Sequence, residues 1–392
     1  MISVLELRSV RGTGGGPEKT ILNGALQHDR DRFAVTVCYV RDARDTVFTI
    51  DQRAEQLGVD YAEVTERHSF DRRIWPQLVA LARDRRADIV HGHDYKTNLV
   101  ALFLARKVGA VPLATSHGWT GQTARERFVY YPADRQVLRR FPRVIAVSGG
   151  VRSELVRAGV TASRVTVLPN GIDPHTYRRG RASRDRVRRQ LELSSEAQVI
   201  GAVGRLERQK RFDLLLDAFA ELRRARPTLR LVIAGDGSLR AALETHARRL
   251  GVAADCRFLG HRTDIVNLHQ AFDLFVQSSE YEGTPNAVLE AMAMETPLVA
   301  TDVGGTSELA FPGEHGVIVP PGDEAALRAG IGVVLADPAA ARDRAAAARL
   351  RIERDLSFAE RTRRLEEIYL TLARGGLRAV GSGHAGAAAE AG

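Results

Sequence analysis

Short apolar runs alternate with amphipathic stretches along almost the whole chain. The apolar runs have the length of buried strands, and the stretches between them repeat apolar residues every three or four positions, as helices that cover a sheet do. Parallel strands need a crossover between them, usually a helix, so this alternation is typical of parallel sheets. The pattern therefore predicts an α/β protein built from two doubly wound halves.

The expected strands divide evenly between the two halves. In the first half the pattern predicts strands near 2–7, 33–40, 88–91, 111–115, 143–147 and 165–168, and helices near 17–28, 50–57, 72–85, 96–108 and 149–158. In the second half it predicts strands near 198–203, 230–234, 255–259, 273–277, 298–301 and 316–319, and helices near 211–225, 238–250, 264–270, 285–294, 305–310, 323–335 and 341–374.

The length of 392 residues also favours two domains, because it exceeds what one hydrophobic core usually organises. We expect an N-terminal Rossmann-like domain at 1–173 and a C-terminal Rossmann-like domain at 197–354, joined by an Arg- and Ser-rich linker at 174–196. A C-terminal helix is expected at 355–374. The Gly- and Ala-rich segment 375–392 is expected to be disordered.

Two carboxylates flank a predicted helix start in the stretch Glu282-Gly-Thr-Pro-Asn-Ala-Val-Leu-Glu290. Thr284 suits the cap and Pro285 the first helical position, so Glu282 would lie in the loop and Glu290 about two turns into the helix. The helix N-terminus favours an anion such as a diphosphate, and the carboxylates can accept hydrogen bonds from sugar and ribose hydroxyls. One nucleotide sugar would occupy all three positions, with Gly283 and Asn286 beside it.

Two cations follow the first strand of the second half. Gly204 and Arg205 end that strand, and Lys210 comes five residues after the arginine, a spacing that lets both side chains contact one diphosphate. The next strand leads into Gly235, where the backbone can approach a ligand closely. A further glycine-rich turn at Gly304 offers backbone amides to phosphate.

In their order along the chain, these motifs resemble the retaining glycosyltransferases of the GT4 type, which have the GT-B fold. The resemblance runs from about Val4 to Leu372 and includes the motif of two glutamates separated by seven residues. It implies two Rossmann-like domains facing across a cleft, with the donor in the second domain and the C-terminal helix bracing the first. The loop between Arg205 and Lys210 departs from the family pattern, because it lacks the usual glycine.

The N-terminal half carries the family's other motifs. Gly14, Gly15 and Gly16 match its glycine loop, which the resemblance places beside the acceptor and, for Gly15 and Gly16, also the donor. His117 matches the active-site histidine, which hydrogen-bonds the donor sugar, and His93 is expected on the acceptor side. The implied catalytic residues are therefore His117, Arg205, Lys210 and Glu282.

The implied enzyme is a hexosyltransferase that moves sugar from a UDP- or GDP-sugar to an acceptor hydroxyl with retained anomeric configuration. Lipid-linked or saccharide acceptors, in cell-surface polysaccharide or glycolipid synthesis, are expected. A non-catalytic nucleotide-sugar binding protein is one alternative. A Rossmann-type NAD(P) oxidoreductase is another, disfavoured because the glycine loop lacks a third glycine at the expected position and the second strand ends in Arg41 instead of an acid.

We expect no cofactor and no metal, because no carboxylate or cysteine follows the histidines at ligand spacing.

Residues 1–200 hold 33 Lys and Arg against 22 Asp and Glu, so the basic excess lies in this half. An Arg and aromatic mixture at 125–143 suits an anionic membrane surface, although a solvated arginine-rich face is the alternative. No nucleic-acid motif accompanies the charge. The protein is expected in the cytoplasm, because no apolar run approaches membrane-spanning length, and a peripheral position at the inner face of the membrane stays open.

Overall fold

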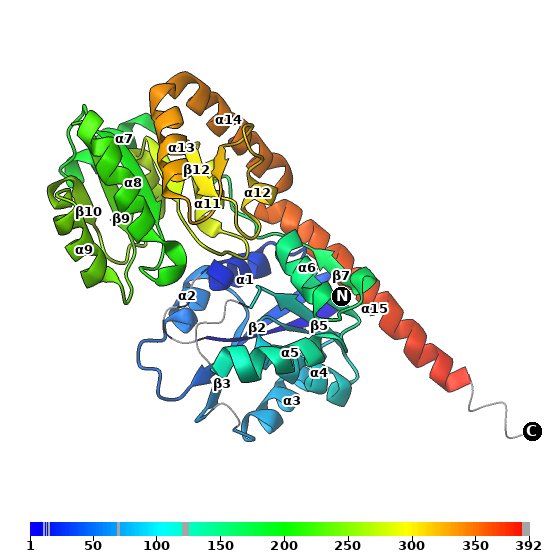
Figure 1. Ribbon diagram of the computed structural model, residues 1–392. Helices are drawn as coiled ribbons and strands as arrows, with labels where there is room; N and C mark the ends of the chain where they lie inside the picture. Colours follow the sequence, from blue (N-terminus) through cyan, green and yellow to red (C-terminus); the bar gives the residue numbers. More distant parts are fainter. Residues whose placement is uncertain (11, 13, 15, 69–70, 120–124, 386–392) are drawn as a thin grey trace, which may run out of the picture. The chain divides into compact units, whose positions relative to one another are not determined.

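The computed structural model describes residues 1–392 except 11, 13, 15, 69–70, 120–124 and 386–392. Its contacts divide the chain into two units, the first formed by Met1–Asn170 with Phe358–Gly392 and the second by Gly171–Ser357. Both units are parallel α/β folds, as the alternating pattern predicts (Figure 1). None of the described helices combines the length and apolar character that a membrane-spanning segment requires.

The first unit has a seven-stranded parallel sheet in the order β3-β2-β1-β4-β5-β6-β7. The strand order reverses between β1 and β4, which is where ligands bind in open α/β sheets, beyond the carboxyl ends of the strands. The strands are β1 (Ile2–Ser9), β2 (Phe33–Asp42), β3 (Tyr61–Glu66), β4 (Ile89–Gly92), β5 (Val111–Ser116), β6 (Arg143–Ala146) and β7 (Val165–Val167).

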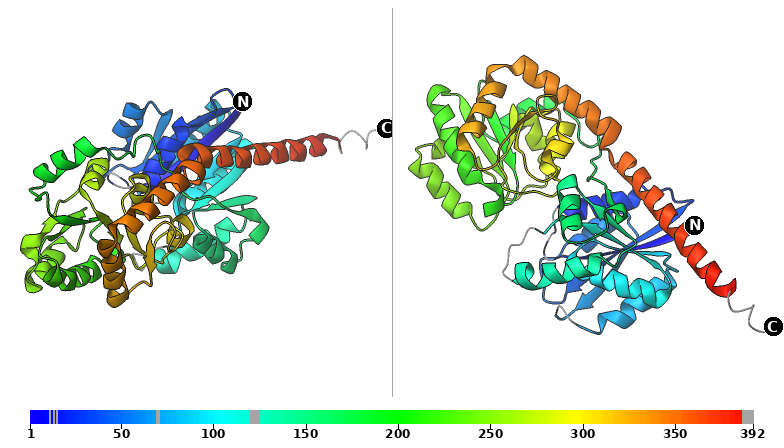
Figure 2. Two further views of the ribbon diagram at one scale, coloured as in Figure 1. Left: turned by 90° about the horizontal axis from the view of Figure 1, so that it is seen from above. Right: turned by 45° about the vertical axis from the view of Figure 1, so that its right-hand side comes forward.

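Helices cover both faces of this sheet. One face packs against α3, α4, α5 and α6, and the other against α1, α2 and the long helix α15, which is visible in both views of Figure 2. The helical segments are α1 (Gly16–Leu26), α2 (Ile50–Leu57), α3 (Ile74–Asp84), α4 (Tyr95–Val108), the π-helical turn η1 (Glu126–Tyr130), α5 (Tyr131–Leu138), α6 (Gly149–Arg157), the 3-10 turn η2 (Ala162–Arg164) and α15 (Phe358–Ala385).

The second unit has a six-stranded parallel sheet in the order β10-β9-β8-β11-β12-β13, with the reversal between β8 and β11. Its strands are β8 (Gln198–Val203), β9 (Leu229–Ala234), β10 (Cys256–Phe258), β11 (Leu274–Gln277), β12 (Leu298–Thr301) and β13 (Val317–Val319). Strands β8 and β12 coincide with the sequence-based prediction. The others agree within one residue at each end.

One face of the second sheet packs against α8, α9 and α13, and the other against α7, α10, α11, α12 and α14. These helices are α7 (Arg181–Gln190), α8 (Phe212–Ala225), α9 (Arg240–Arg249), α10 (Ile265–Ala271), α11 (Asn286–Ala293), α12 (Thr306–Leu309), α13 (Glu324–Ala336) and α14 (Pro338–Asp355), with 3-10 turns η3 (Arg208–Lys210) and η4 (Ala253–Asp255).

Several predictions need correction. The helix expected at 341–374 is two helices, α14 and α15, and α5 was not predicted. The expected linker 174–196 contains α7, whose Val187 is buried against the helices and strands of the second unit. The segment 375–392 was expected to be disordered, but α15 continues as helix to Ala385, and the rest of this prediction, 386–392, lies outside the described residues. Strand β3 was not predicted, because it is an edge strand whose only buried apolar residue is Val64.

Candidate functional site

Loops from four strands converge at the carboxyl edge of the second sheet, around the reversal between β8 and β11. Gly235 has φ +146°, and a Cβ atom there would lie 1.8 Å from the carbonyl oxygen of Gly204. Gly304 has φ +55°, and its Cβ would lie 1.9 Å from the carbonyl oxygen of Glu282. Only glycine permits this contact between neighbouring loops. The predicted donor motifs of the second domain are therefore neighbours in space.

Lys210 and Glu282 form an ion pair at the centre of these loops. The ammonium nitrogen lies 2.5 Å from Oε1 of the carboxylate, and both side chains are largely buried. The hydroxyl of Ser279 donates to the same carboxylate oxygen at 2.7 Å, and Ser278 donates to the Lys210 carbonyl oxygen at 2.8 Å. The pair thus places one cation next to a carboxylate that can accept hydrogen bonds from sugar hydroxyls.

Arg205 lies at the start of the same loop and is exposed. Its neighbours Gly204 and Leu206 are fixed by backbone hydrogen bonds to Ala234 and Asp236, so the arginine starts from an ordered backbone. Among the residues that the structure describes, no hydrogen bond or ion pair occupies its guanidinium. This side chain is available to an anion.

Glu290 is buried on α11, and its Oε1 accepts a hydrogen bond from the hydroxyl of Tyr177 at 3.1 Å. Burial raises the pKa of Tyr177, and the adjacent carboxylate adds to the effect. The helix begins at Asn286 with Pro285 in the cap position, so our placement of Thr284 as the cap was wrong by one residue. The turn at Gly283 is fixed through its carbonyl oxygen, which accepts from the amide of Gly305 at 2.9 Å.

A buried polar cluster lies at the switch point of the first sheet, where Glu6 of β1 pairs with His91 of β4. The hydroxyl of Tyr369 donates to Glu6 at 3.0 Å, and the ring nitrogens of His91 and His93 lie 3.5 and 3.8 Å from the same oxygen. Burial by itself raises the pKa of Glu6, but the two imidazoles hold it well below its usual range. Burial and the neighbouring His93 lower the pKa of His91 to about 3.

His117 follows β5 directly, and its ring lies 6.3 Å from that of His93. Burial lowers the pKa of His117 well below its usual range, and the cation of Arg8 lowers it further. Its Nε2 is enclosed and has no hydrogen-bond partner in the described part of the chain. Both ring nitrogens of His93 are likewise enclosed and have no hydrogen-bond partner among the described residues. These two imidazoles retain unused hydrogen-bonding capacity.

The predicted glycine loop lies before α1 at the carboxyl end of β1. Gly14 has φ +69° and is exposed, and Gly16 is the first residue of α1. Gly15, predicted for both donor and acceptor, lies outside the described residues. Glu18, in the first turn of α1, accepts from Nε of Arg8 at 2.9 Å, which ties this helix start to β1.

The pairing of β1 with β4 brings a carboxylate, Glu6, to the histidines, which the spacing along the chain did not reveal. Ligand atoms of Glu6, His91 and His93 all lie within 4.8 Å of one another. However, Nδ1 of His91 is 3.0 Å from the Tyr369 hydroxyl and Nε2 is 2.8 Å from that of Thr115. His91 would have to give up a hydrogen bond to bind an ion, so the cluster suits a hydrogen-bonded network better than a metal.

Comparisons with known proteins agree with this geometry. The family model described as glycosyl transferases group 1 matches residues 183–351, and the model described as glycosyltransferase family 4 matches residues 14–176. A glycogen synthase of Mycobacterium tuberculosis is 31% identical over 357 residues, covering 86% of this chain and 80% of that protein. The chain belongs to this glycosyltransferase family. The resemblance inferred from the motifs and the prediction of an enzyme are thereby confirmed.

Other relatives of this glycosyltransferase include a lipopolysaccharide core biosynthesis mannosyltransferase of Rhizobium meliloti, 30% identical and covering 61% of this chain and 68% of that protein. Among solved structures, Anabaena Alr3699/HepE in complex with UDP-glucose has a TM-score of 0.83 at 23% identity, covering 95% of this chain and 100% of that one. This likeness confirms the predicted fold class.

Several residues of this glycosyltransferase's candidate site were not predicted. Glu6 and Arg8 could have been noticed, because charges at alternate positions of a buried strand must share one face and need partners. Tyr177 and Ser279 gave no signal, because single hydroxyls are common and their partners are fixed by tertiary packing. Tyr369 lay in a predicted amphipathic helix, where an aromatic residue usually means only core packing.

Proposed function

We propose that this glycosyltransferase moves a hexosyl unit from a UDP- or GDP-sugar to an acceptor hydroxyl with retention of configuration. The observation that carries the proposal is the convergence of Arg205, Lys210 and Glu282 with the Gly304 turn at the switch point of the second sheet. A diphosphate and a sugar present the complementary anionic and hydroxyl groups.

The departing diphosphate gains negative charge in the transition state, so preorganised cations stabilise that state more than the ground state. Arg205 offers an unoccupied guanidinium for this purpose. Lys210 is held by Glu282, and a bound diphosphate would share its ammonium. Glu282 would then accept hydrogen bonds from sugar hydroxyls, and Glu290 from the ribose.

The named relatives support the donor class without deciding it. Anabaena Alr3699/HepE is described in complex with UDP-glucose, and the Rhizobium meliloti relative is described as a mannosyltransferase in lipopolysaccharide core biosynthesis. For this chain we infer cell-surface polysaccharide or glycolipid synthesis as the process. A non-catalytic binding protein is disfavoured, since the polar groups of the donor motif are all retained.

In the first unit, both ring nitrogens of His93 and Nε2 of His117 are enclosed and lack hydrogen-bond partners among the described residues. A neutral imidazole can donate or accept one hydrogen bond to a sugar hydroxyl. We infer that His93 contributes to acceptor binding, as does the loop at Gly14 and Gly16, and that His117 hydrogen-bonds the donor sugar.

A panel of UDP- and GDP-sugars tests the donor class by thermal shift and by transfer to saccharide acceptors. A donor at 100 times its dissociation constant should stabilise the protein by roughly 2.7 kcal/mol. Product analysis by NMR should show the anomeric configuration of the donor. An inverted product, or no stabilisation by any nucleotide sugar, would refute the proposal.

We also infer that transfer needs no metal, because Arg205 and Lys210 can neutralise the diphosphate. Activity should survive excess EDTA. Loss of activity with EDTA, followed by recovery with magnesium or manganese, would contradict this inference.

We further infer that the protein works in the cytoplasm, peripheral at an anionic membrane face. In the segment 125–143, Phe128 and Val129 are exposed apolar residues, and the guanidiniums of Arg125 and Arg127 lie 5.4 and 5.9 Å from the neighbouring rings of Tyr130 and Phe128. Apolar anchors beside cations suit the surface of an anionic bilayer.

Vesicle sedimentation tests this docking. The variants should replace arginines that make no hydrogen bonds to the backbone. Arg139 and Arg140 donate to the carbonyl oxygens of Ala158 and Gln136, so their replacement would also perturb helix ends. Arg127→Ser with Phe128→Ser should reduce binding to phosphatidylserine vesicles at low salt by at least roughly fivefold, given about 1 kcal/mol for the one cation removed and the further loss of an apolar anchor. Unchanged sedimentation relative to Arg224→Ser, an exposed arginine of the second unit, would count against the proposal.

A further inference from the structure

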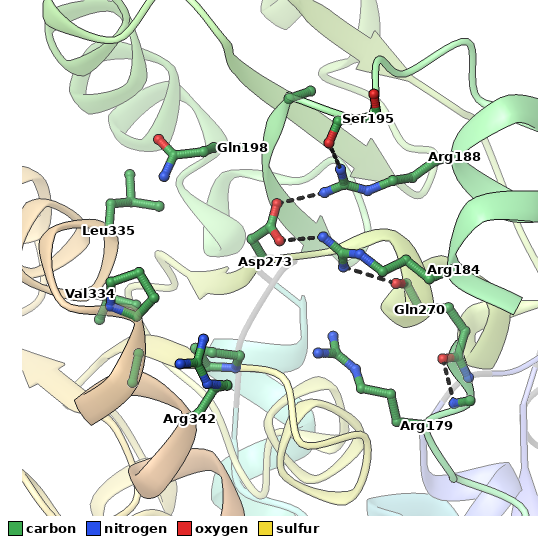
Figure 3. A pocket seen from close by; sticks show the side chains of 15 residues that line it. Arg179, Arg184, Arg188, Ser195, Gln198, Gln270, Asp273, Val334, Leu335 and Arg342 are labelled. Atoms are coloured by element: carbon green, nitrogen blue, oxygen red, sulfur yellow. Dashed lines mark hydrogen bonds and ion pairs between the residues drawn. The ribbon is translucent and has the colours of Figure 1, made fainter. Parts of the chain in front are cut away.

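A cationic pocket lies at the edge of the second sheet opposite to the donor motifs. Its lining includes Gln198, Asp273 and Pro297, which stand at or just before the amino ends of β8, β11 and β12. Figure 3 labels Gln198 and Asp273. The donor motifs follow the carboxyl ends of these parallel strands. Since β8 has six residues at about 3.3 Å each, the two edges are roughly 20 Å apart along that strand. The pocket is therefore separate from the candidate donor site.

Three arginines on one side of this pocket hold the end of α10. Arg184 and Arg188, on α7, lie 2.5 and 2.6 Å from the two carboxylate oxygens of Asp273, as the dashed lines of Figure 3 mark. Arg179 donates to the carbonyl oxygens of His269 and Phe272 at 3.0 and 2.8 Å. Part of this arginine cluster thus has a structural role, satisfying carbonyl groups that a helix end leaves free.

The positive charge of the lining exceeds what Asp273 neutralises. Four arginines line the pocket, Arg342 of α14 facing the other three from across it, and Asp273 is the one carboxylate among the lining residues (Figure 3). Arg342 is exposed, and in the described part of the chain nothing hydrogen-bonds or ion-pairs with it. The Nε of Arg179 is enclosed and has no partner among the described residues.

The arginines also act on one another. Burial lowers the pKa of Arg179, and the neighbouring Arg184 lowers it further. Burial likewise lowers the pKa of Arg188, which Asp273 only partly offsets. The carboxylate of Glu295 raises the pKa of Arg179, and that of Asp185 raises the pKa of Arg188, each by less than burial lowers it. Neither carboxylate lines the pocket. An anion in the pocket would relieve this repulsion.

The pocket has the size and the wall of a small-molecule site. Its volume is about 480 Å³, within the usual range for ligand pockets. Opposite α7, the wall is apolar and is formed by Val334, Leu335, Pro338 and Ala341 of α13 and α14. A ligand with an anionic end and a compact, partly apolar body matches both walls.

We propose that this pocket binds a small phosphorylated molecule, with its phosphate between Arg179 and Arg342 and its body against the α13–α14 wall. Guanidinium groups contact phosphate in bidentate geometry. The lining has an excess of three positive charges, from four arginines and one aspartate, and a phosphate monoester carries up to two negative charges. A carboxylate would balance only one of them. The proposal does not depend on the donor specificity, because it concerns the other edge of the sheet.

Calorimetry on the full chain tests the pocket, with UDP or GDP, whichever the parent binds, present throughout to fill the donor site. The probes are ribose 5-phosphate, inorganic phosphate and ribose. Ribose 5-phosphate should bind at one site and ribose should not. Arg342→Glu should weaken this binding at least roughly tenfold, because a carboxylate would then face the phosphate, and should leave UDP affinity unchanged.

The matched control is Arg224→Glu, which reverses an exposed helical arginine away from the pocket and should leave both titrations unchanged. Equal binding of inorganic phosphate and ribose 5-phosphate would support the pocket with free phosphate as occupant. No binding of either anion at 10 mM, or equal binding by the parent and Arg342→Glu, would overturn the proposal. Failure of the parent to bind both UDP and GDP would instead contradict the proposed donor site.

Discussion

Lys210 shows how one side chain can have two partners at different stages of binding. Its ammonium lies 2.5 Å from Oε1 of Glu282, and a diphosphate would compete for the same charge. Arg205, by contrast, is exposed and unoccupied among the described residues. The two cations should therefore contribute differently to stability and similarly to catalysis.

Replacing either cation by alanine should lower turnover about 30- to 1000-fold, since each loss removes roughly 2–4 kcal/mol of transition-state stabilisation. Arg205→Ala should leave unfolding unchanged. Lys210→Ala should cost about 1–3 kcal/mol of stability, because it leaves a largely buried carboxylate whose one remaining hydrogen-bond partner among the described residues is the Ser279 hydroxyl. Steady-state kinetics and urea unfolding measure both effects. Parental turnover and UDP affinity in both variants would show that the donor site lies elsewhere.

The buried histidines of the first unit should make its stability depend on pH. The pKa values of His91 and His117 are lowered in the folded state, whereas histidine in an unfolded chain titrates near 6.5. Below pH 6.5 the unfolded state therefore binds more protons, so stability is complete above that pH and is lost as the pH falls. From pH 7.5 to 5.5 the two residues should together remove about 2–3 kcal/mol.

Urea unfolding followed by tryptophan fluorescence measures this loss, because both tryptophans, Trp75 and Trp119, lie in the first unit. His117→Gln should remove about half of the loss, and His175→Gln, an exposed histidine of the second unit, should leave it unchanged. A free energy of unfolding that stays constant between the two pH values would contradict the assignment.

At the scale of elements, the contact between two loops requires glycine at Gly304. A Cβ atom there would lie 1.9 Å from the Glu282 carbonyl oxygen, at a φ that side chains rarely adopt. Gly304→Ala should therefore displace the loop that holds Glu282, cost about 2 kcal/mol or more of stability, and weaken UDP binding at least roughly tenfold.

Gly332→Ala is the matched control for this prediction. Gly332 lies inside α13, its φ is not positive, and a Cβ atom there would meet nothing within 4 Å. Alanine is the better helix former, so this variant should be neutral or up to about 1 kcal/mol more stable. Calorimetric UDP titrations and thermal unfolding compare the two. Equal behaviour of both variants would argue against a tight loop contact.

At the scale of the whole molecule, the chain returns to its first unit after Ser357. Helix α15 then places Leu365, Tyr369 and Leu372 in the core of that unit, and the Tyr369 hydroxyl donates to Glu6. Ending the chain after Ser357 should therefore unfold the first unit, because each lost apolar side chain contributes about 1.5–3 kcal/mol. Ending it after Gly375 keeps these residues and should change stability by less than about 1 kcal/mol. Tryptophan fluorescence during urea unfolding distinguishes the two, and a folded first unit in the shorter chain would refute the role of α15.

The sequence by itself predicted the α/β class, all strands of the second sheet to within one residue at each end, and the candidate donor residues Arg205, Lys210, Glu282 and Glu290. These features are local, since buried strands and helix starts carry their signals within a few residues. Elements with weak local signals were missed or misjudged. Strand β3 is a polar edge strand. Helix α7 is itself rich in arginine, and the burial of its Val187 depends on packing against α10.

Only the tertiary structure decided which distant residues share a site. The pairing of β1 with β4 brings Glu6 to His91, and Tyr177 reaches Glu290 across 113 positions of the chain. The pocket between α7 and α14 likewise joins Arg179 and Arg342. A single sequence records periodicity and local chemistry, but contacts between residues far apart follow from strand order and packing, which no local pattern specifies.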